Sequence, residues 1–511
     1  MEDHLTAVSR RRWLGLVSGP FLFALCLALP RPAELSPAAF HTLAVTILMA
    51  WWWITEAIPI AVTALLPLVL FPLLHISTPR TVASAYADAN IFLFMGGFFV
   101  AMAMEKWGLH QRIALRIIQL VGTSPRRVLL GFMVATAFLS MWISNTATTL
   151  MMLPIGIAII RHVEIFAREG KGEDDPNFKT ALMLGIAFAA SIGGIGTLIG
   201  TPPNIVFVAS LKKLFPGAPE IGFVQWLGIG LPLVAIMLPI AWAYLAFVAL
   251  PVRLPAIPGG STLIRERLEE LGPMNGGERG TLTVFLLMAF AWIWRADINL
   301  GGFVIPGWST LLGLKGYVHD STVAMAAAVL LFLIPGDRRR GEFLLDWETA
   351  VKIPWGILLL FGGGIALAQG FSGTGLAQWI GNHLTRLGNV PIWVTILATA
   401  VLLVLLTEVT SNTAITTIFM PILAATAMGS HENPLLLMVT GTIAASLAFM
   451  LPVATPPNAI VFGSGYVTLP QMAKVGFVLD VIGVVVLLVL MYTLGLHVFG
   501  IHPGVVPGWS Q

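Results

Sequence analysis

Long apolar segments, separated by short polar ones, recur along the whole chain. A helix that crosses a bilayer needs about 20 apolar residues, and most of these segments approach or exceed that length. They are Trp13–Pro30, Phe40–Ile76, Asn90–Trp107, Arg126–Ile160, Thr180–Leu214, Gln225–Leu250, Leu282–Arg295, Thr322–Ile334, Pro354–Gln369, Pro391–Met428, Leu435–Phe462 and Val475–Val498. The pattern predicts an all-α polytopic membrane protein with about eleven transmembrane helices and two re-entrant hairpins.

Several of these segments are interrupted near their middle. Phe40–Ile76 breaks at Thr55–Pro59, because proline disfavours helix at the residue before it. Arg126–Ile160 and Pro391–Met428 each contain a polar break halfway, and we interpret them as hairpins that enter and leave on one side. Non-helical backbone at membrane depth is tolerated only where protein or a water-filled cavity covers it. The broken spans are Thr180–Leu214 and Leu435–Phe462.

Three polar or amphipathic stretches lie between the predicted membrane segments. Leu109–Val121 carries Arg112 and is expected to lie on the membrane surface. Arg161–Lys179 reads as a polar loop, and a short helix is expected at Leu263–Leu271. The chain thus divides into an N-terminal segment with the first helix (1–38), a first repeat (39–252), a cytoplasmic linker (253–280), a second repeat (281–500) and a tail (501–511). An odd number of spans between the starts of the repeats predicts that they are inverted.

Composition supports a membrane protein and excludes other classes. The 511 residues are 57% hydrophobic and 10% charged, against about 25% charged in soluble proteins. With the N-terminus cytoplasmic and the C-terminus outside, 21 of the 28 Lys and Arg residues fall on the inner side, as the positive-inside rule requires. The net charge of +3 therefore does not indicate nucleic-acid binding. The single cysteine, Cys26, excludes an internal disulfide and a cysteine metal cluster.

A polar motif occurs twice, 267 residues apart (411 minus 144). Seven of the twelve positions from Ser144 to Ile155 are identical to those of Ser411–Ile422. Each copy is followed by a second shared element, Thr201–Asn204 in the first half and Thr455–Asn458 in the second. Duplicated, helix-breaking motifs in an apolar chain are typical of secondary transporters built from internal repeats.

These motifs predict four helix N-termini that converge near the midplane. Ser, Thr and Asn are preferred N-caps, and Pro202 and Pro456 suit the first helical position. Helix N-termini carry partial positive charge and free N–H groups, so together they favour an anion. Unwound carbonyls and side-chain oxygens offer ligands for a small alkali cation, so one assembly can bind an anion and Na⁺.

Basic residues are missing around both motifs. Between Met133 and Leu153, and between Val394 and Met420, the sequence contains no Lys, Arg or His. A buried dianion without a cationic partner is prohibitively costly. Co-bound cations would remove that cost, which favours Na⁺ symport over anion exchange.

For several residues a purely structural role is the alternative to a functional one. A single Ser-Asn-Thr could serve only as interhelical hydrogen-bonding glue, but two matched copies disfavour that. Glu408 is either a proton-coupling site or, more commonly for such a carboxylate, structural. Asp480, like Asp297 near the end of a span, is expected to be solvated. The tryptophans Trp51–Trp53 and Trp226 fit an interfacial belt.

The chain resembles the divalent anion:sodium symporter (DASS, or INDY-like) family over about residues 40–500. Thr55–Pro59 with Val62–Pro67, both Ser-Asn-Thr copies and both Thr-Pro-Pro-Asn copies carry the resemblance. It implies a homodimer with scaffold helices in 39–122 and 281–388. It further implies an elevator-type transport domain formed by the hairpins and transport helices of 123–252 and 389–500.

The resemblance also implies the site residues. Substrate carboxylates would meet Asn145, Thr146, Thr201, Asn412, Thr413 and Thr455. The first Na⁺ site would use Ser140, Ser144, Asn145 and Gly200, and the second Thr407, Thr410, Asn412 and Ala454. Thr410 stands where a smaller residue is common, and a carbonyl contribution from that position makes the difference unimportant.

The expected function is transport and not catalysis. We expect a Na⁺-coupled importer of C4-dicarboxylates (succinate, malate, fumarate) in a bacterial inner membrane, with Na⁺ as the co-transported ion and no nucleic-acid partner. A dicarboxylate exchanger, or a Na⁺-coupled citrate or sulfate transporter, remains the alternative. An integral-membrane enzyme is disfavoured, since the motifs supply no catalytic carboxylate or histidine beside a basic phosphate-binding cluster.

Overall fold

The computed structural model describes residues 2–122, 124–169, 174–257, 260–299, 304–384 and 391–510, and these are overwhelmingly helical. The helices of the first half are α1 (Glu2–Ala28), α2 (Pro37–Thr55), α3 (Ile60–Thr63), α4 (Leu66–Leu73), α5 (Pro79–Ala85), α6 (Ala89–Lys106), α7 (Leu109–Val121), α8 (Pro125–Ser140), α9 (Asn145–Arg168), α10 (Pro176–Ile195), α11 (Pro202–Leu214) and α12 (Phe223–Ala243), which continues as the π-helix η1 (Tyr244–Ala249).

The second half follows the linker helix α13 (Gly260–Glu270). Its helices are α14 (Gly276–Ile293), α15 (Trp308–Leu311), α16 (Asp320–Leu333), α17 (Trp347–Ala350), α18 (Trp355–Thr374), α19 (Leu376–Leu384), α20 (Ile392–Thr407), α21 (Asn412–Gly429), α22 (Pro434–Ala444), α23 (Pro456–Gly463), α24 (Leu469–Leu490), the π-helix η3 (Met491–Gly495), α25 (Leu496–Val498) and the 3₁₀-helix η4 (Gly508–Ser510). Two short antiparallel hairpins pair β1 (Ile298–Asn299) with β2 (Val304–Ile305) and β3 (Pro335–Asp337) with β4 (Glu342–Phe343).

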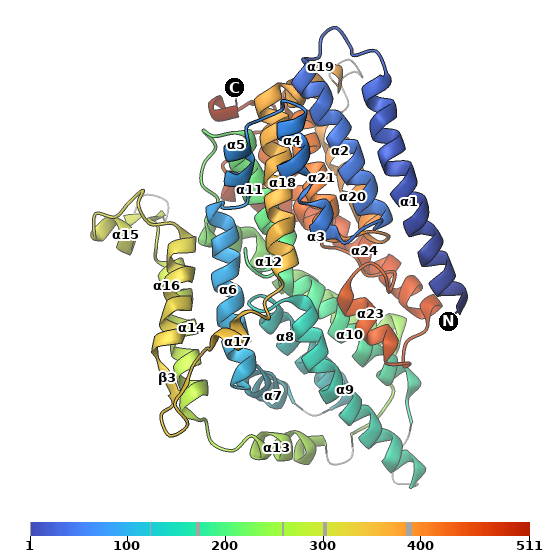
Figure 1. The fold of residues 1–511 in the computed structure, drawn as a ribbon. Coiled ribbons are helices and arrows are strands. Elements are labelled where there is room, and N and C mark those ends of the chain that lie inside the picture. Colours follow the sequence, from blue (N-terminus) through green and yellow to red (C-terminus); the bar gives the residue numbers. More distant parts are fainter. Residues whose placement is uncertain are drawn as a thin grey trace.

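The two predicted hairpins enter from opposite faces. Helices α8 and α9 lie in the lower half of the molecule in Figure 1, and α20 and α21 lie in the upper half. The break between α10 and α11 and the break between α22 and α23 lie at one cavity together with both hairpin tips. The two halves are therefore inverted relative to each other, as the sequence predicts.

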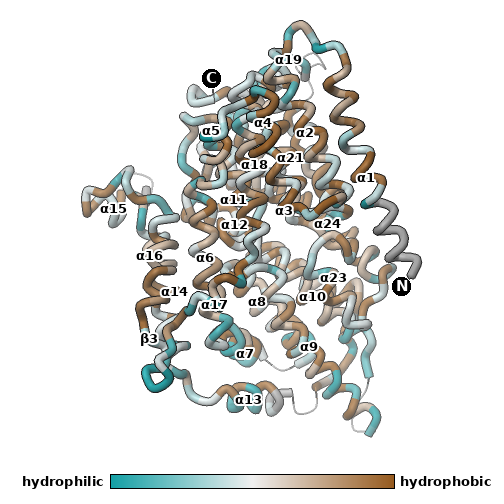
Figure 2. The backbone as a smooth tube through the Cα atoms, viewed as in Figure 1, coloured by the Kyte–Doolittle hydropathy of each residue, from teal (hydrophilic) through white to brown (hydrophobic). Residues whose placement is uncertain are grey.

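Helix length and hydropathy agree with a membrane protein. Among the described residues, eight helices are long and apolar enough to cross a bilayer, and five further apolar helices are shorter. The shorter ones include α20 and α22, which belong to the second hairpin and the second broken span. Figure 2 shows hydrophobic helices through the middle and hydrophilic residues gathered at the ends, notably along α7 and α13.

The predicted loop Arg161–Lys179 is mostly helix. Helix α9 continues to Arg168, and α10 begins at Pro176 with Asp175 as its N-cap. The prediction is wrong because polarity marks where a helix leaves the membrane and not where its backbone hydrogen bonds end.

The surface helix α7 is more strongly anchored than its sequence suggests. Arg116 is exposed, but only 8% of Arg112 is exposed. The guanidinium of Arg112 donates through Nε to Oε1 of Glu278 (2.7 Å) and through Nη1 to the carbonyl of Gly272 (2.9 Å). This buried ion pair fastens α7 to the end of the linker and to the first turn of α14.

Two of the tryptophans predicted for an interfacial belt are buried. Trp53 and Trp226 are both 0% exposed, whereas Trp51 is 37% exposed. The indole N–H of Trp53 donates to the carbonyl of Ile60 (3.1 Å), and that of Trp226 donates to the carbonyl of Ile195 (2.9 Å). The interfacial prediction is wrong for these two because their N–H groups satisfy carbonyls where a neighbouring helix begins or ends.

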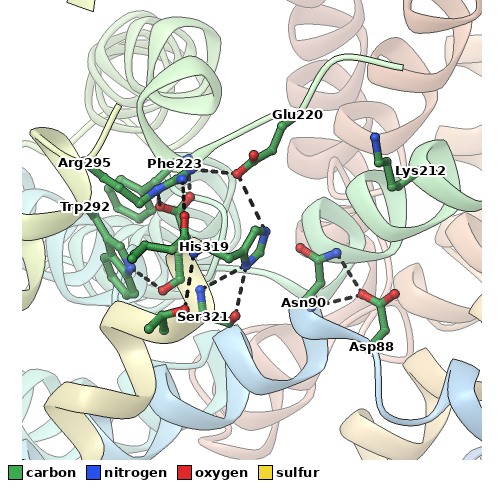
Figure 3. A network of polar contacts seen from close by, with 12 residues as sticks. Asp88, Asn90, Lys212, Glu220, Phe223, Trp292, Arg295, His319 and Ser321 are labelled. Atoms are coloured by element: carbon green, nitrogen blue, oxygen red, sulfur yellow. Dashed lines mark hydrogen bonds and ion pairs between the residues drawn. The ribbon is translucent and has the colours of Figure 1, made fainter. Parts of the chain in front are cut away.

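A polar network joins the N-terminus of α12 to the ends of α14 and α16 (Figure 3). Arg295 donates through Nε to Asp320 (2.5 Å) and through Nη2 to Glu220 (2.7 Å). The second oxygen of Asp320 accepts the backbone N–H of Phe223 at 2.9 Å. Arg295 and Asp320 are 8% and 2% exposed, so this network is a buried connection between the two halves of the chain.

Candidate substrate and cation site

One cavity of about 860 Å³ contains both hairpin tips and both broken-helix breaks. All six residues predicted to contact substrate line it, namely Asn145, Thr146, Thr201, Asn412, Thr413 and Thr455. Residues 144 and 145 lie more than 250 positions before 411 and 412 in the chain, so only the inverted fold brings them to one place.

Four helices begin at this cavity. They are α9, α11, α21 and α23, and their first residues follow Ser144, Thr201, Ser411 and Thr455. Oγ of Ser144 accepts the N–H of Ala147 (3.3 Å), and Oγ1 of Thr455 accepts that of Asn458 (3.3 Å).

The other two N-cap side chains make no such bond. Thr201 and Ser411 stand at the N-cap positions of α11 and α21, but neither side chain caps its helix. Their hydroxyls therefore differ from those of Ser144 and Thr455, which the capping bonds occupy. All four N-termini still direct partial positive charge at the cavity, which suits an anion.

The predicted cation residues form an oxygen-rich cluster in the first half. Oγ of Ser140 lies 2.7 Å from Oδ1 of Asn145 and 2.7 Å from the carbonyl of Ala190. A hydroxyl has one proton and can donate to only one of these acceptors. With the Asn145 amide reversed, its two N–H groups face three acceptors, namely Ser140 Oγ (2.7 Å), the Ala190 carbonyl (3.3 Å) and the Gly200 carbonyl (3.2 Å).

The second half repeats this cluster. Oγ1 of Thr407 lies 2.7 Å from Oδ1 of Asn412 and 2.8 Å from the carbonyl of Ala445. Two acceptors again share one hydroxyl proton. A small cation would relieve such crowding of oxygens, so the second cluster fits Na⁺, and the first cluster fits it when the amide oxygen of Asn145 faces Ser140.

The remaining predicted cation ligands divide between the cavity wall and the interior. Ser144, Gly200 and Ala454 line the cavity together with the two asparagines. Ser140 and Thr407 are 0% exposed and Thr410 is 4% exposed, so these three lie behind the wall. The hydroxyl of Thr410 donates to the carbonyl of Leu406 (2.8 Å), so its proton is already used within its own turn.

Close packing against glycine holds Asn145 in place. A Cβ atom on Gly194 would lie 2.5 Å from Oδ1 and 3.0 Å from Nδ2 of Asn145. Gly194 belongs to α10 just before its unwound end. No side chain larger than hydrogen fits at this position without moving the amide.

The asparagines of the Thr-Pro-Pro-Asn elements stabilise the unwound links, a structural role that sequence reasoning missed. Nδ2 of Asn204 donates to the carbonyl of Thr197 (2.7 Å), and Nδ2 of Asn458 donates to the carbonyl of Leu451 (3.0 Å). Both asparagines are 0% exposed. Each asparagine thereby connects the first turn of its helix, α11 or α23, to the unwound link before it.

The cavity lacks a cationic side chain among the described residues that line it. Glu56 is the ionisable one, and it stands at the C-cap of α2 with φ of 49°. Sequence reasoning missed Phe94, Phe98 and Leu360, which close the cavity from α6 and α18. The described part of the chain also contains no His/Cys/Asp/Glu group fit to hold a metal ion.

Two acidic residues behind the second hairpin are deeply buried. Glu408 and Asp480 are each 3% exposed. The prediction that Asp480 is solvated is wrong, because α24 runs on to Leu490 and Asp480 faces the protein at its middle. A charged residue in the middle of a long apolar helix was the available signal.

The chain is similar to known membrane transporters along nearly its whole length. A family model for the sodium:sulfate symporter transmembrane region matches residues 10–501. The sodium-dependent dicarboxylate transporter SdcS of Staphylococcus saprophyticus is 46% identical over 490 residues, which are 96% of this chain and 92% of that protein. The protein of the same name from Staphylococcus aureus strain MRSA252 is 45% identical over the same shares.

Two solved structures share the fold. The YdaH transporter of Alcanivorax borkumensis gives a TM-score of 0.53 at 14% identity, covering 79% of this chain and 86% of that one. MtrF of Neisseria gonorrhoeae gives 0.55 at 10% identity, covering 96% and 100%. At these identities the likeness supports the fold alone. The match of the family model to nearly the whole length, with relatives close to half identical, shows that the chain belongs to the sodium:sulfate symporter family.

Proposed function

We propose that this protein is a Na⁺-coupled symporter of C4-dicarboxylates. The observation that carries the proposal is the convergence of four helix N-termini on a cavity in which no Lys, Arg or His is found among the described lining residues. Relatives that share 45–46% of their residues with it are named sodium-dependent dicarboxylate transporters.

The two ends of the substrate would meet the two hairpin tips. One carboxylate would accept hydrogen bonds from Asn145, Thr146 and Thr201, and the other from Asn412, Thr413 and Thr455. Each helix N-terminus supplies only about half an elementary charge, which the negative C-terminal end of the same short helix opposes. Two Na⁺ ions would neutralise the remainder.

The cations would bind where hydroxyl, amide and carbonyl oxygens crowd. The first site would comprise Ser140, Ser144, Asn145 and Gly200, and the second Thr407, Thr410, Asn412 and Ala454. Because Asn145 and Asn412 border both cation and substrate, binding of one favours binding of the other. Each Na⁺ supplies about 1.4 kcal/mol per tenfold gradient. The gain of about 2.3 kcal/mol per 100 mV for each positive charge is offset by the two negative charges of the substrate, so the Na⁺ gradient drives a complex of two Na⁺ and one dianion.

Movement of the site would follow an elevator mechanism. The scaffold would comprise 39–122 and 281–388, and the transport domain 123–252 and 389–500. We further propose a homodimer, with the N-terminus in the cytoplasm and the C-terminus outside. The excess of 21 over 7 basic residues on one face supports this orientation.

The second candidate is the same machinery with another anion or coupling mode. The description of the matching family model names sulfate, which supports a sulfate transporter. Citrate transport and dicarboxylate exchange complete the alternatives. Transport of sulfate or citrate predicts that the protein binds succinate weakly. Dicarboxylate exchange predicts that succinate uptake does not depend on Na⁺.

Uptake of radiolabelled succinate into proteoliposomes tests the proposal. Vesicles would carry an inward Na⁺ gradient, or K⁺ in place of Na⁺, or unlabelled succinate inside. Symport predicts uptake that needs external Na⁺ and no internal substrate. Uptake that needs internal succinate and ignores Na⁺ would establish exchange and contradict the proposal, and unlabelled sulfate and citrate as competitors identify another anion.

A further inference from the structure

Polar side-chain contacts between the proposed scaffold and the proposed transport domain gather at one short stretch of chain. This stretch, residues 213–223, contains the end of α11, the start of α12 and the loop between them, and we call it the α11–α12 loop. Its partners lie in the proposed scaffold (39–122 and 281–388). Figure 3 shows Glu220 extending from this loop towards Arg295 and His319.

Two ion pairs connect the loop to the scaffold. Oε1 of Glu220 lies 2.7 Å from Nη2 of Arg295, and Nζ of Lys213 lies 3.3 Å from Oδ2 of Asp88. The scaffold side chains are mostly buried, with 10% of Arg295 and 13% of Asp88 exposed. The loop side chains are more accessible, with 51% of Glu220 and 25% of Lys213 exposed. Each pair therefore joins a buried charge on the scaffold to a more exposed charge on the loop.

Two hydrogen bonds to the backbone hold the same loop at its ends. The N–H of Phe223 donates to Oδ2 of Asp320 (2.9 Å), and Oγ of Ser372 donates to the carbonyl of Lys213 (3.2 Å). Asp320 begins α16 and Ser372 lies in α18, so both partners belong to the proposed scaffold. Main chain and side chains of the loop are thus attached to the same body.

The scaffold charges keep other partners when the loop is removed. Arg295 still donates through Nε to Asp320 (2.5 Å) and through Nη1 to the carbonyl of Val318 (3.0 Å). Asp88 still accepts the N–H of Asn90 (3.0 Å) as the N-cap of α6. Withdrawal of the loop therefore leaves no buried scaffold charge without a partner, and water can hydrate Glu220. These contacts are suited to break and re-form.

Aromatic rings form the neighbouring part of the same boundary. The ring of Phe223 stacks on Trp292 of α14 (centroids 4.7 Å apart) and on Trp142 (5.9 Å), which lies two residues before Ser144 at the first hairpin tip. Stacked rings have no directional hydrogen bond that fixes their offset, whereas ion pairs fix the register of two surfaces. The charged contacts of the loop therefore define where the transport domain stops against the scaffold.

The corresponding loop of the second half, residues 464–468 between α23 and α24, is attached differently. Oγ1 of Thr180 donates to the carbonyl of Tyr466 (3.0 Å), and Oγ1 of Thr468 donates to Oε1 of Gln471 (2.8 Å). Within the described part of the chain, the side-chain hydrogen bonds of this loop stay inside the proposed transport domain. Because inverted repeats exchange their arrangements between two end states, a contact made by only one repeat favours one of those states.

We propose that the α11–α12 loop is a latch that holds the transport domain against the scaffold in the end state of this structure. Movement of the transport domain must break the pairs of Glu220 with Arg295 and of Lys213 with Asp88, because each pair joins the two bodies that move apart. This inference rests on the elevator mechanism of the proposed function. It assigns the balance between the two end states to residues outside the substrate cavity.

The distance between two spin labels tests the latch. Cys26, the single cysteine, is replaced by serine in the full-length protein. Labels are attached at Tyr317→Cys in the scaffold and at Lys474→Cys near the start of α24, both at exposed positions. Distance distributions in lipid nanodiscs are recorded with and without Na⁺ and succinate. The population at the distance of this structure is the latched state.

Loss of either ion pair should depopulate the latched state. Glu220→Gln and Lys213→Gln are each expected to lower the ratio of latched to unlatched protein by about two- to fivefold, as for a partly exposed pair. Asp88→Asn should match Lys213→Gln, because asparagine keeps the N-cap of α6. Combining these two should shift the ratio no further than either alone, since both remove the same pair.

Glu269→Gln is the matched control. Glu269 pairs with Arg265 inside the linker helix α13 (2.8 Å), so its loss removes a pair of the same chemistry that does not join the two bodies. This variant should leave the distance distribution unchanged. Unchanged populations in Glu220→Gln and Lys213→Gln, whether or not their thermal unfolding midpoints fall, would show that the contacts are only structural and overturn the latch. A single distance in every variant and condition would overturn it too.

Succinate uptake by the same proteins separates this inference from the proposed function. Uptake by the wild-type protein that does not need Na⁺ refutes symport, and a shift of populations in the loop variants would still support the latch. Conversely, Na⁺-dependent uptake with unchanged populations would leave symport standing and refute the latch.

Discussion

The hydroxyl of Thr407 lies 2.7 Å from the amide oxygen of Asn412, and the same distance separates Ser140 from Asn145 in the other half. In both halves the hydroxyl also meets a carbonyl of the neighbouring broken span. In each half the hydroxyl residue and the asparagine are five residues apart, on the two sides of the hairpin tip. The duplicated motif is therefore also a duplicated arrangement of oxygen atoms.

Replacing either asparagine by alanine should abolish coupled transport. Asn145→Ala or Asn412→Ala removes an amide that borders both the proposed cation and substrate positions, so we expect uptake to fall by more than about tenfold, as for loss of a hydrogen bond to a charged group. Uptake in proteoliposomes measures this. Thr493→Ala is the control, because the Thr493 hydroxyl bonds to Val489 of its own helix. Normal uptake in both asparagine variants would refute the site.

A methyl group at Gly194 should act on Na⁺ binding through Asn145. The added Cβ would lie 2.5 Å from Oδ1, so the amide must move. We expect a loss of about 1 to 2 kcal/mol of binding free energy, or roughly 5- to 30-fold in half-saturating Na⁺. Gly373→Ala in α18, where a Cβ meets nothing within 4 Å, serves as control and should leave Na⁺ dependence unchanged. Equal effects of the two substitutions would contradict the packing argument.

In the network of Figure 3, neutralising Asp320 and neutralising Glu220 should reduce the free energy of unfolding by different amounts. The side chain of Asp320 is 3% exposed and that of Glu220 is 51% exposed, and both pair with Arg295. Asp320→Asn leaves a buried guanidinium undercompensated and should cost about 3 kcal/mol or more of unfolding free energy. Glu220→Gln should cost about 1 kcal/mol or less. Thermal unfolding in detergent compares the two, and equal shifts in midpoint would show that burial does not decide the cost.

The ion pair between Asp346 and Lys106, which lies outside the membrane-spanning helices, should make the stability of the folded protein depend on pH. A hydrogen bond from Lys106 lowers the pKa of Asp346 to about 2 from its usual 3.8. A lowered pKa stabilises the folded state above the usual value, and that contribution disappears as the pH falls from 3.8 towards 2. The Asp346 side chain is 44% exposed, so Asp346→Asn should cost under about 1 kcal/mol at neutral pH.

Unfolding midpoints of the wild-type protein and Asp346→Asn, measured at several pH values, check this. The difference between the two proteins should be constant near neutrality and shrink in acid. A difference that grows as the pH falls would show that the pKa of Asp346 is raised in the folded state.

Much of the fold follows from local features of the sequence. Proline and the Ser-Asn-Thr motif mark the hairpin tips, and α9 and α21 begin at Asn145 and Asn412, where the motif places them. The breaks before Pro202 and Pro456 are also where the sequence places them. These features are predictable because caps and helix breaks depend on residues within one or two turns.

Other features could not be read from the chain. The burial of Trp226 and Asp480 and the ion pair of Arg112 depend on which side of a helix meets protein and which meets lipid. Hydropathy does not distinguish these, since lipid tails and packed side chains are equally apolar. The positions of Phe94 and Leu360 in the cavity wall depend on the same distinction.

The sequence by itself determined the membrane class, the inverted duplication and the chemistry of the two motifs, because each depends on composition or on residues close together in the chain. Tertiary structure alone decided that four helix N-termini meet in one cavity and that Glu220 pairs with Arg295. Those relations join residues tens to hundreds of positions apart. Packing between helices sets them, and no local pattern of hydrophobic and polar residues encodes it.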